Sequence, residues 1–348
     1  MIKWFALVTM VLLAACTTVQ EKVFVANEDD GSISVIDAGA LKEIDRVSLS
    51  MGMGRSAQKF TLHNVQVAGD LVLVTANAVP EGIAGQERMQ EMQGASDTQG
   101  QPDQLVVMDA RTHRILYRVD LDVDAHLAHV VSDGRFAYVT STEKDLLYQI
   151  DLKARKLVSV FDLPKGSMPH GLRLSPDGGL AVIAGMGKSM VLLNLDTNMM
   201  QSIPLPGKGV QAAVVGGLAF VSVYDTKQVA VYDIRTSELS YIDLPGAKGP
   251  IQMYPSPDGR FLYVADQGVY FDQPQGDSIY KLDISKREVS TIFEKVGLAP
   301  HGVAVSPDGR IWVTNLKGNS VSVLDENGTL VEIKVGASPN GVSWYSAR

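Results

Sequence analysis

The sequence predicts an all-β protein: a seven-bladed β-propeller with four-stranded blades, the last of which is closed by strands from both ends of the chain. Three observations lead to this fold class. A short motif recurs seven times, and most of its intervals are about 40 residues, the usual length of a four-stranded blade. Each interval contains alternating apolar runs separated by turn residues. No convincing helical periodicity appears after the first 15 residues.

The recurring motif is clearest in "MPHGLRLSPDGG" (168–179) and "APHGVAVSPDGR" (299–310). Aligning the copies places one polar residue at the start of each, and we call these seven the anchor residues. They are His63, His129, His170, Gln211, Gln252, His301 and Asn340. Two intervals are longer than the others because they contain insertions, 78–104 and 267–277.

Residues 301–335 show the order of strands within one repeat. "HGVAVS" is the first strand, and "PDG" predicts a tight turn because Pro fixes φ and Gly accepts a positive φ. "RIWVTN", "NSVSVLD" and "GTLVEIKV" follow as the second, third and fourth strands. The same order is expected in the repeats 128–167, 170–208, 210–249 and 251–298.

The two chain ends together supply one blade. Only one strand, "NGVSWYS", follows Asn340, whereas residues 22–49 supply three strands that lack a first. Sharing a blade between the ends closes the ring and removes a free sheet edge. The propeller is therefore expected to span residues 22–346.

Residues 1–15 are expected to be a signal peptide. Lys3 precedes the apolar run "WFALVTMVLLAA", which is too short to span a membrane. The run ends in "LAAC" (13–16), which resembles the lipobox of bacterial lipoproteins, and Cys16 is the only cysteine in the chain. We expect Cys16 to carry acyl chains such as palmitate and residues 16–21 to form an anchor linker. By the same resemblance, Thr17 in place of an aspartate implies sorting to the outer membrane, on the periplasmic side of the cell envelope.

Composition and motifs exclude several classes of function. The formal net charge is −8 and no basic run occurs, so nucleic acid is not an expected partner. The sequence has no phosphate-cradling loop, no nucleophile–base constellation and no CxxCH motif for covalent haem.

The predicted second strands carry a family resemblance. "VFVAN", "VLVTAN", "AYVTS", "LYVAD" and "IWVTN" resemble the repeat of YVTN-family β-propellers over residues 22–346, including periplasmic proteins similar to YncE. The resemblance implies a seven-bladed propeller but no single activity. Some relatives bind copper, or carry a site like that of haem d1, on propeller histidines. Residues 300–335, one blade of the seven, also resemble streptogramin lyase.

The anchor residues are the main candidate site, because the first strand of each propeller blade lines the central channel. Two interpretations remain open. Duplication could have copied a structural histidine that caps a neighbouring blade or holds a water. Alternatively, the imidazoles converge on a copper or zinc ion, or on an anionic ligand. The expected metal ligands are His63, His129 and His170 as the core, with His301 from across the channel and His126 as an extra ligand. Gln211, Gln252 and Asn340 would complete the ring as ligand-binding residues.

Both insertions are expected on the face of the ring of anchors, where Met89 and Met92 could reach a soft metal. Arg55 is the one candidate for a lactonase site, and His113 is expected on the surface. Three functions remain open. The protein could be a lipid-anchored envelope propeller that binds a metal ion or a small ligand, a non-catalytic scaffold for another envelope protein, or a propeller lyase or lactonase.

Overall fold

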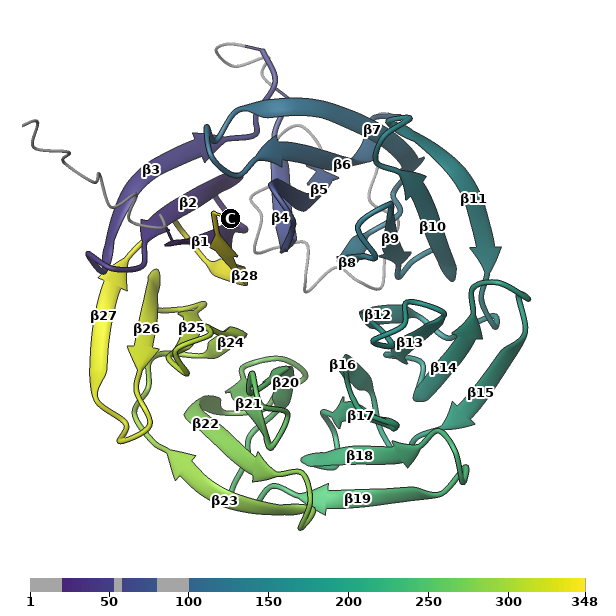
Figure 1. Ribbon diagram of the computed structural model, residues 1–348, viewed down its shortest axis with the longest axis vertical. Coiled ribbons are helices and arrows are strands. Elements are labelled where there is room, and N and C mark those ends of the chain that lie inside the picture. Colours follow the sequence, from purple (N-terminus) through teal and green to yellow (C-terminus); the bar gives the residue numbers. More distant parts are fainter. Residues whose placement is uncertain (1–20, 53–57, 80–99, 348) are drawn as a thin grey trace, which may run out of the picture.

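A computed structural model describes residues 21–52, 58–79 and 100–347, and these form seven four-stranded antiparallel sheets arranged around a central axis (Figure 1). The predicted seven-bladed propeller is therefore confirmed. No helix long and apolar enough to cross a membrane occurs among these residues. Cys16, Arg55, Met89 and Met92 lie outside the described residues.

Each blade has an inner, a second, a third and an outer strand. The inner strands are β4 (Phe60–Ala68), β8 (Leu127–Ser132), β12 (Pro169–Leu174), β16 (Gly209–Val215), β20 (Pro250–Pro255), β24 (Pro300–Val305) and β28 (Pro339–Ser346). The second strands are β5 (Leu71–Ala78), β9 (Phe136–Ser141), β13 (Leu180–Gly185), β17 (Leu218–Val223), β21 (Phe261–Gly268), β25 (Ile311–Asn315) and β1 (Glu21–Asn27).

The remaining strands lie farther from the axis. The third strands are β6 (Pro102–Asp109), β10 (Leu146–Asp151), β14 (Ser189–Asn194), β18 (Gln228–Asp233), β22 (Gln275–Asp283), β26 (Ser320–Leu324) and β2 (Ser32–Asp37). The outer strands are β7 (Ile115–Val123), β11 (Lys156–Asp162), β15 (Met200–Pro204), β19 (Leu239–Asp243), β23 (Glu288–Phe293), β27 (Leu330–Lys334) and β3 (Lys42–Ser48).

The hydrophobic core lies between the faces of adjacent blades. Second and third strands are buried along nearly their whole length, as in β5 and β6, because both of their faces pack against neighbouring sheets. Outer strands such as β3 are largely exposed and read as alternating polar sequences. This pattern explains why apolar runs dominate the middle of every repeat.

The "SPDG" motifs form the turns between inner and second strands. The amide of Gly309 donates to the carbonyl of Ser306 at 2.9 Å, and Gly178 and Gly259 make the equivalent bonds to Ser175 and Ser256. All three glycines have a positive φ of 68–87°, which other residues adopt with strain. The motif thus ends these three inner strands at a fixed residue.

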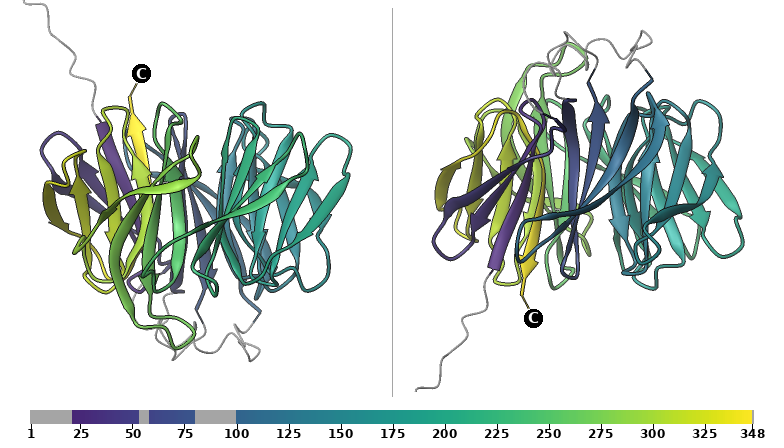
Figure 2. Two further views of the ribbon diagram at one scale, coloured as in Figure 1. Left: turned by 90° about the horizontal axis from the view of Figure 1, so that it is seen from below. Right: turned by 90° about the horizontal axis from the view of Figure 1, so that it is seen from above.

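The ring closes through strands from both chain ends. One sheet has the order β28-β1-β2-β3, with Val23 of β1 paired to Trp344 and Val25 paired to Val342. We call the face at which the inner strands begin the entry face, and the face at which they end the exit face. Glu21 pairs with Ser346, so both ends of the described chain lie at the exit face (Figure 2).

A buried lysine fastens this shared blade to the next one. Lys22 is 2% exposed, and its Nζ donates to the carbonyls of Ala110 and Arg111 at 3.2 and 2.9 Å. The same Nζ lies 2.8 Å from Nε2 of His113, whose Nδ1 lies 2.7 Å from a carboxylate oxygen of Asp45. His113 is therefore not the free surface residue that was expected, because it joins two blades.

Candidate metal centre

The seven anchor residues lie at corresponding places near the beginning of the inner strands, and all are buried. In all seven blades the pairing of inner and second strands shifts register at or beside the anchor. In β12, for example, the shift falls between Pro169 and Leu172. Such bulges turn a side chain out of its regular alternation. The bulge therefore points each anchor side chain in a direction that it would not have in a regular strand.

A hydroxyl group in the second strand holds several of these bulges. Oγ1 of Thr140 accepts a hydrogen bond from the amide of His129 at 3.0 Å and donates to the carbonyl of His170 at 2.7 Å. Ser222 and Thr314 form the same bridge from their own inner strand to the anchor strand of the next blade. Thr140 and Thr314 occupy the hydroxyl position of the "VTS" and "VTN" motifs, and Ser222 occupies the equivalent position of "VSV". The recurring hydroxyl therefore positions the anchor strands. The sequence analysis did not predict this role for the second-strand motif.

The glycine of each "PHG" motif allows two inner strands to approach closely. A Cβ atom on Gly171 would lie 2.4 Å from Cα of Gln211, and one on Gly302 would lie 2.3 Å from the carbonyl oxygen of Asn340. Both distances are far inside van der Waals contact. Glycine is therefore required beside these anchors if adjacent blades are to meet near the axis.

Three imidazoles converge at the axis. Each of His63, His129 and His170 offers a ring nitrogen, and these atoms all lie within 4.8 Å of one another. The shortest pair joins Nε2 of His63 and Nε2 of His170 at 3.1 Å, across the intervening blade. Nitrogen ligands at about 2.0–2.1 Å from a tetrahedral ion are about 3.3 Å apart. The spacing of this pair is close to that of two ligands of one ion.

The tautomer of His170 is fixed by its surroundings. Its Nδ1 lies 2.9 Å from the carbonyl oxygen of Val210, which can only accept, so Nδ1 carries the proton. Nε2 therefore presents a lone pair toward His63. Metal-binding imidazoles are commonly oriented in this way, by donation of the other ring N–H to a carbonyl group.

Two glutamine anchors surround His129. The amide of Ala212 donates to Oε1 of Gln211 at 2.8 Å, so Nε2 of Gln211 faces Oε1 of Gln252 at 3.2 Å. The two side-chain amides also lie 3.4 Å from Nδ1 and Nε2 of His129. A neutral imidazole has one lone pair, so His129 accepts at most one of these long bonds. Gln211 and Gln252 therefore both contact the His129 ring, and their role in ligand binding stays a prediction.

Burial keeps the four anchor histidines uncharged. It lowers the pKa of His170 to about 4 and that of His301 to about 3. Burial and the neighbouring imidazoles lower the pKa of His63 well below 6.5, and burial, His170 and Arg173 do the same for His129. At neutral pH all four rings are therefore neutral and can donate a lone pair to a metal ion.

The other candidate residues lie at the edge of this cluster. The rings of His126 and His301 lie 5.4 and 6.5 Å from the ring of His63, between centroids, and neither belongs to the group of three. Nδ2 of Asn340 donates to Oε2 of Glu28 at 2.9 Å. Asn340 therefore uses its amide in the closing blade, whereas His126 and His301 remain near enough to approach the site.

Comparison with known proteins finds a repeat model that matches one short part of the chain. A model of the NHL repeat matches residues 299–324, and no curated protein matches the chain. The hydrazine synthase of Kuenenia stuttgartiensis is similar in structure, with a TM-score of 0.64 and 16% identity over 82% of this chain and 92% of that one. Virginiamycin B lyase from Staphylococcus aureus has a TM-score of 0.64 and 15% identity over 80% of this chain and 87% of that one.

A streptogramin B lyase structure is similar over more of the chain. Its TM-score is 0.63 with 15% identity, over 94% of this chain and 92% of that one. At these identities the similarity shows a shared propeller fold.

Proposed function

We propose that this protein is a propeller of the bacterial envelope that binds one copper or zinc ion near its central axis. The observation that carries the proposal is the convergence of three buried, uncharged imidazoles, His63, His129 and His170, within 4.8 Å. Imidazole nitrogen suits copper and zinc far better than calcium or magnesium. Three protein ligands leave a fourth position for a water, a substrate or another imidazole, as in catalytic zinc sites.

The test is metal analysis of protein exported in cells and purified without a histidine tag. We expect about one copper or zinc per chain after incubation with either ion and removal of the excess. The double variant His63→Ala/His170→Ala should retain none. His113→Gln is the matched control, because this histidine lies between outer parts of two blades, and it should bind as the unaltered protein does. Unaltered protein that fails to retain either ion would refute the proposal.

The envelope location rests on the N-terminal sequence. "LAAC" resembles a lipobox, and Cys16 is the only cysteine in the chain. We place the protein on the periplasmic side of the outer membrane, held by acyl chains on Cys16. The same N-terminal pattern and the second-strand motifs support a relationship to lipid-anchored YVTN-type propellers.

A propeller lyase is the second candidate. It is favoured by the three structural neighbours that are lyases of this kind and by the unprotonated Nε2 of His170, which can accept a proton. One such neighbour was solved with quinupristin. Loss of quinupristin on incubation with the protein, but not with His170→Ala, would support a lyase; stable quinupristin would exclude this substrate.

A further inference from the structure

A second site lies at the exit face, at the far end of the inner strands from the anchor residues. A cavity of about 270 Å³ is lined there by the last residues of five inner strands, β4, β8, β12, β16 and β20. A single water needs only about 10–15 Å³. The volume is just below the range of about 300–1,000 Å³ that is usual for drug-sized ligands, so it suits a smaller organic molecule.

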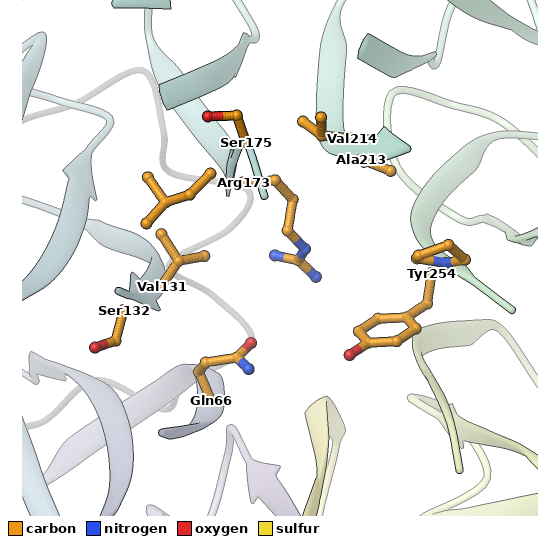
Figure 3. Close-up of a pocket in the computed structure, with 10 residues that line it drawn as sticks. Gln66, Val131, Ser132, Arg173, Ser175, Ala213, Val214 and Tyr254 are labelled. Carbon is orange, nitrogen blue, oxygen red and sulfur yellow. The ribbon is translucent and has the colours of Figure 1, made fainter. Parts of the chain in front are cut away.

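The guanidinium of Arg173 occupies the centre of this cavity, between Gln66 and Tyr254 (Figure 3). Leu172 and Leu174 pack in the core between two blades, and strand alternation turns Arg173 away from them. Without the bulge in β12, His170 would face the same side as Leu172. The bulge therefore allows the side chains of His170 and Arg173 to contribute to two different sites, one at each end of β12.

Arg173 is a cation without an anionic partner among the described residues. Its Nη1 donates to the carbonyl of Leu172 at 2.8 Å, and its guanidinium carbon lies 5.9 Å from the centre of the Tyr254 ring. Neither group carries a negative charge, and no ion pair within the described part of the chain includes Arg173. A guanidinium has five donors in a planar fork that matches a carboxylate. Most of this donor capacity remains available.

The charge and polarity of the residues that line the cavity indicate which class of ligand it can bind. Arg173 is the one charged residue among the ten that line it, which balances a single negative charge. Val131, Ala213 and Val214 add apolar surface to the lining. We propose that the exit-face cavity binds a small organic monocarboxylate, with its carboxylate on Arg173 and its hydrocarbon part against the apolar lining. The site is distinct from the anchor residues, since none of them lines this cavity.

The test uses calorimetric titration of the full-length, metal-free protein with hexanoate in a phosphate-free buffer. Saturable binding of hexanoate is expected, with binding of the uncharged hexanamide at least tenfold weaker. Equal binding of the acid and the amide would overturn the proposal without any variant. Tighter binding of inorganic phosphate than of hexanoate would overturn the choice of a monocarboxylate.

Variants assign the binding to this cavity. Arg173→Met should weaken hexanoate binding at least tenfold, whereas Arg260→Met should leave it unchanged. Arg260 is the matched control because it is an exposed arginine in an exit-face turn. The double variant His63→Ala/His170→Ala should bind hexanoate as the unaltered protein does. The metal proposal and the hexanoate proposal are therefore tested independently, and one can fail without the other. Unaltered affinity in a folded Arg173→Met protein would refute the assignment.

Discussion

The buried histidines should make the stability of the metal-free protein depend steeply on pH. His170 has a pKa of about 4 in the folded protein against 6.5 in an exposed chain. A lowered folded-state pKa means that the unfolded chain binds the proton first, so stability is complete above pH 6.5 and falls as the pH drops toward 4. The relevant range is therefore pH 4 to 6.5, on the acid side of neutrality.

The size of the effect follows from the same pKa values. Between pH 7 and pH 5 an exposed imidazole becomes almost fully protonated, whereas His170 in the fold stays neutral. This difference costs about 2 kcal/mol of unfolding free energy. His301, with a folded pKa of about 3, causes a similar decrease in the unfolding free energy, about 2 kcal/mol. Because domains are typically stable by only about 5–15 kcal/mol, the combined loss is large.

Urea denaturation at pH 7 and pH 5, with chelator present, measures this difference. In His170→Gln the loss between the two pH values should be smaller by about 2 kcal/mol, whatever the absolute stability of the variant. Gln211→Leu is the control, because it alters the same ring without removing a titrating group and should keep the full pH dependence. If His170→Gln also keeps the full dependence, the reasoning from buried neutral imidazoles is wrong.

Three further predictions concern closure and anchoring. Deleting residues 340–348 removes nearly all of β28 and exposes the edges of its neighbours, so thermal unfolding should lose cooperativity; an unchanged melting curve would contradict closure by both ends. Lys22→Met removes the donor to two buried carbonyls and should lower the unfolding free energy by about 1–3 kcal/mol, measured by urea denaturation; a smaller change would mean that water replaces the ammonium. Cys16→Ser should leave an uncleaved or mislocalised precursor, followed by its size and fractionation; normal processing to a soluble chain would refute the lipobox interpretation.

The repeat made the architecture predictable from the sequence, whereas the directions of individual side chains could not be predicted. Seven anchors and a blade divided between the chain ends are properties of spacing, which the sequence displays directly. The positions of His63, His129 and His170 on successive blades follow from the same spacing, although their metal binding stays a prediction. Bulges held by hydroxyls such as Thr140 depend on contacts between blades, which one sequence does not reveal.

Three residues illustrate contacts that could not be predicted from sequence patterns. Asn340 is aligned with the other anchors, yet its side-chain amide donates to Glu28, which directly follows the neighbouring strand β1. His113 is in a polar outer segment, but a buried lysine from another blade reaches it. In both cases a partner distant in sequence decides the outcome. Arg173 has no counterpart among the anchors, and its direction follows from alternation with Leu172 and Leu174 of the core.

The place where the two chain ends meet would also determine how the molecule is oriented on a membrane. Strand β1 begins at Glu21 on the exit face, and a fully extended chain from Cys16 to Glu21 spans at most about 18 Å. If acyl chains on Cys16 hold the protein to a bilayer, the tether is no longer than about the width of one four-stranded blade, roughly 14–19 Å. The cavity of Arg173 would then face the lipid surface, and the histidine cluster would open toward the aqueous compartment. Ligands for the two sites would arrive from opposite directions, one along the membrane and one from solution.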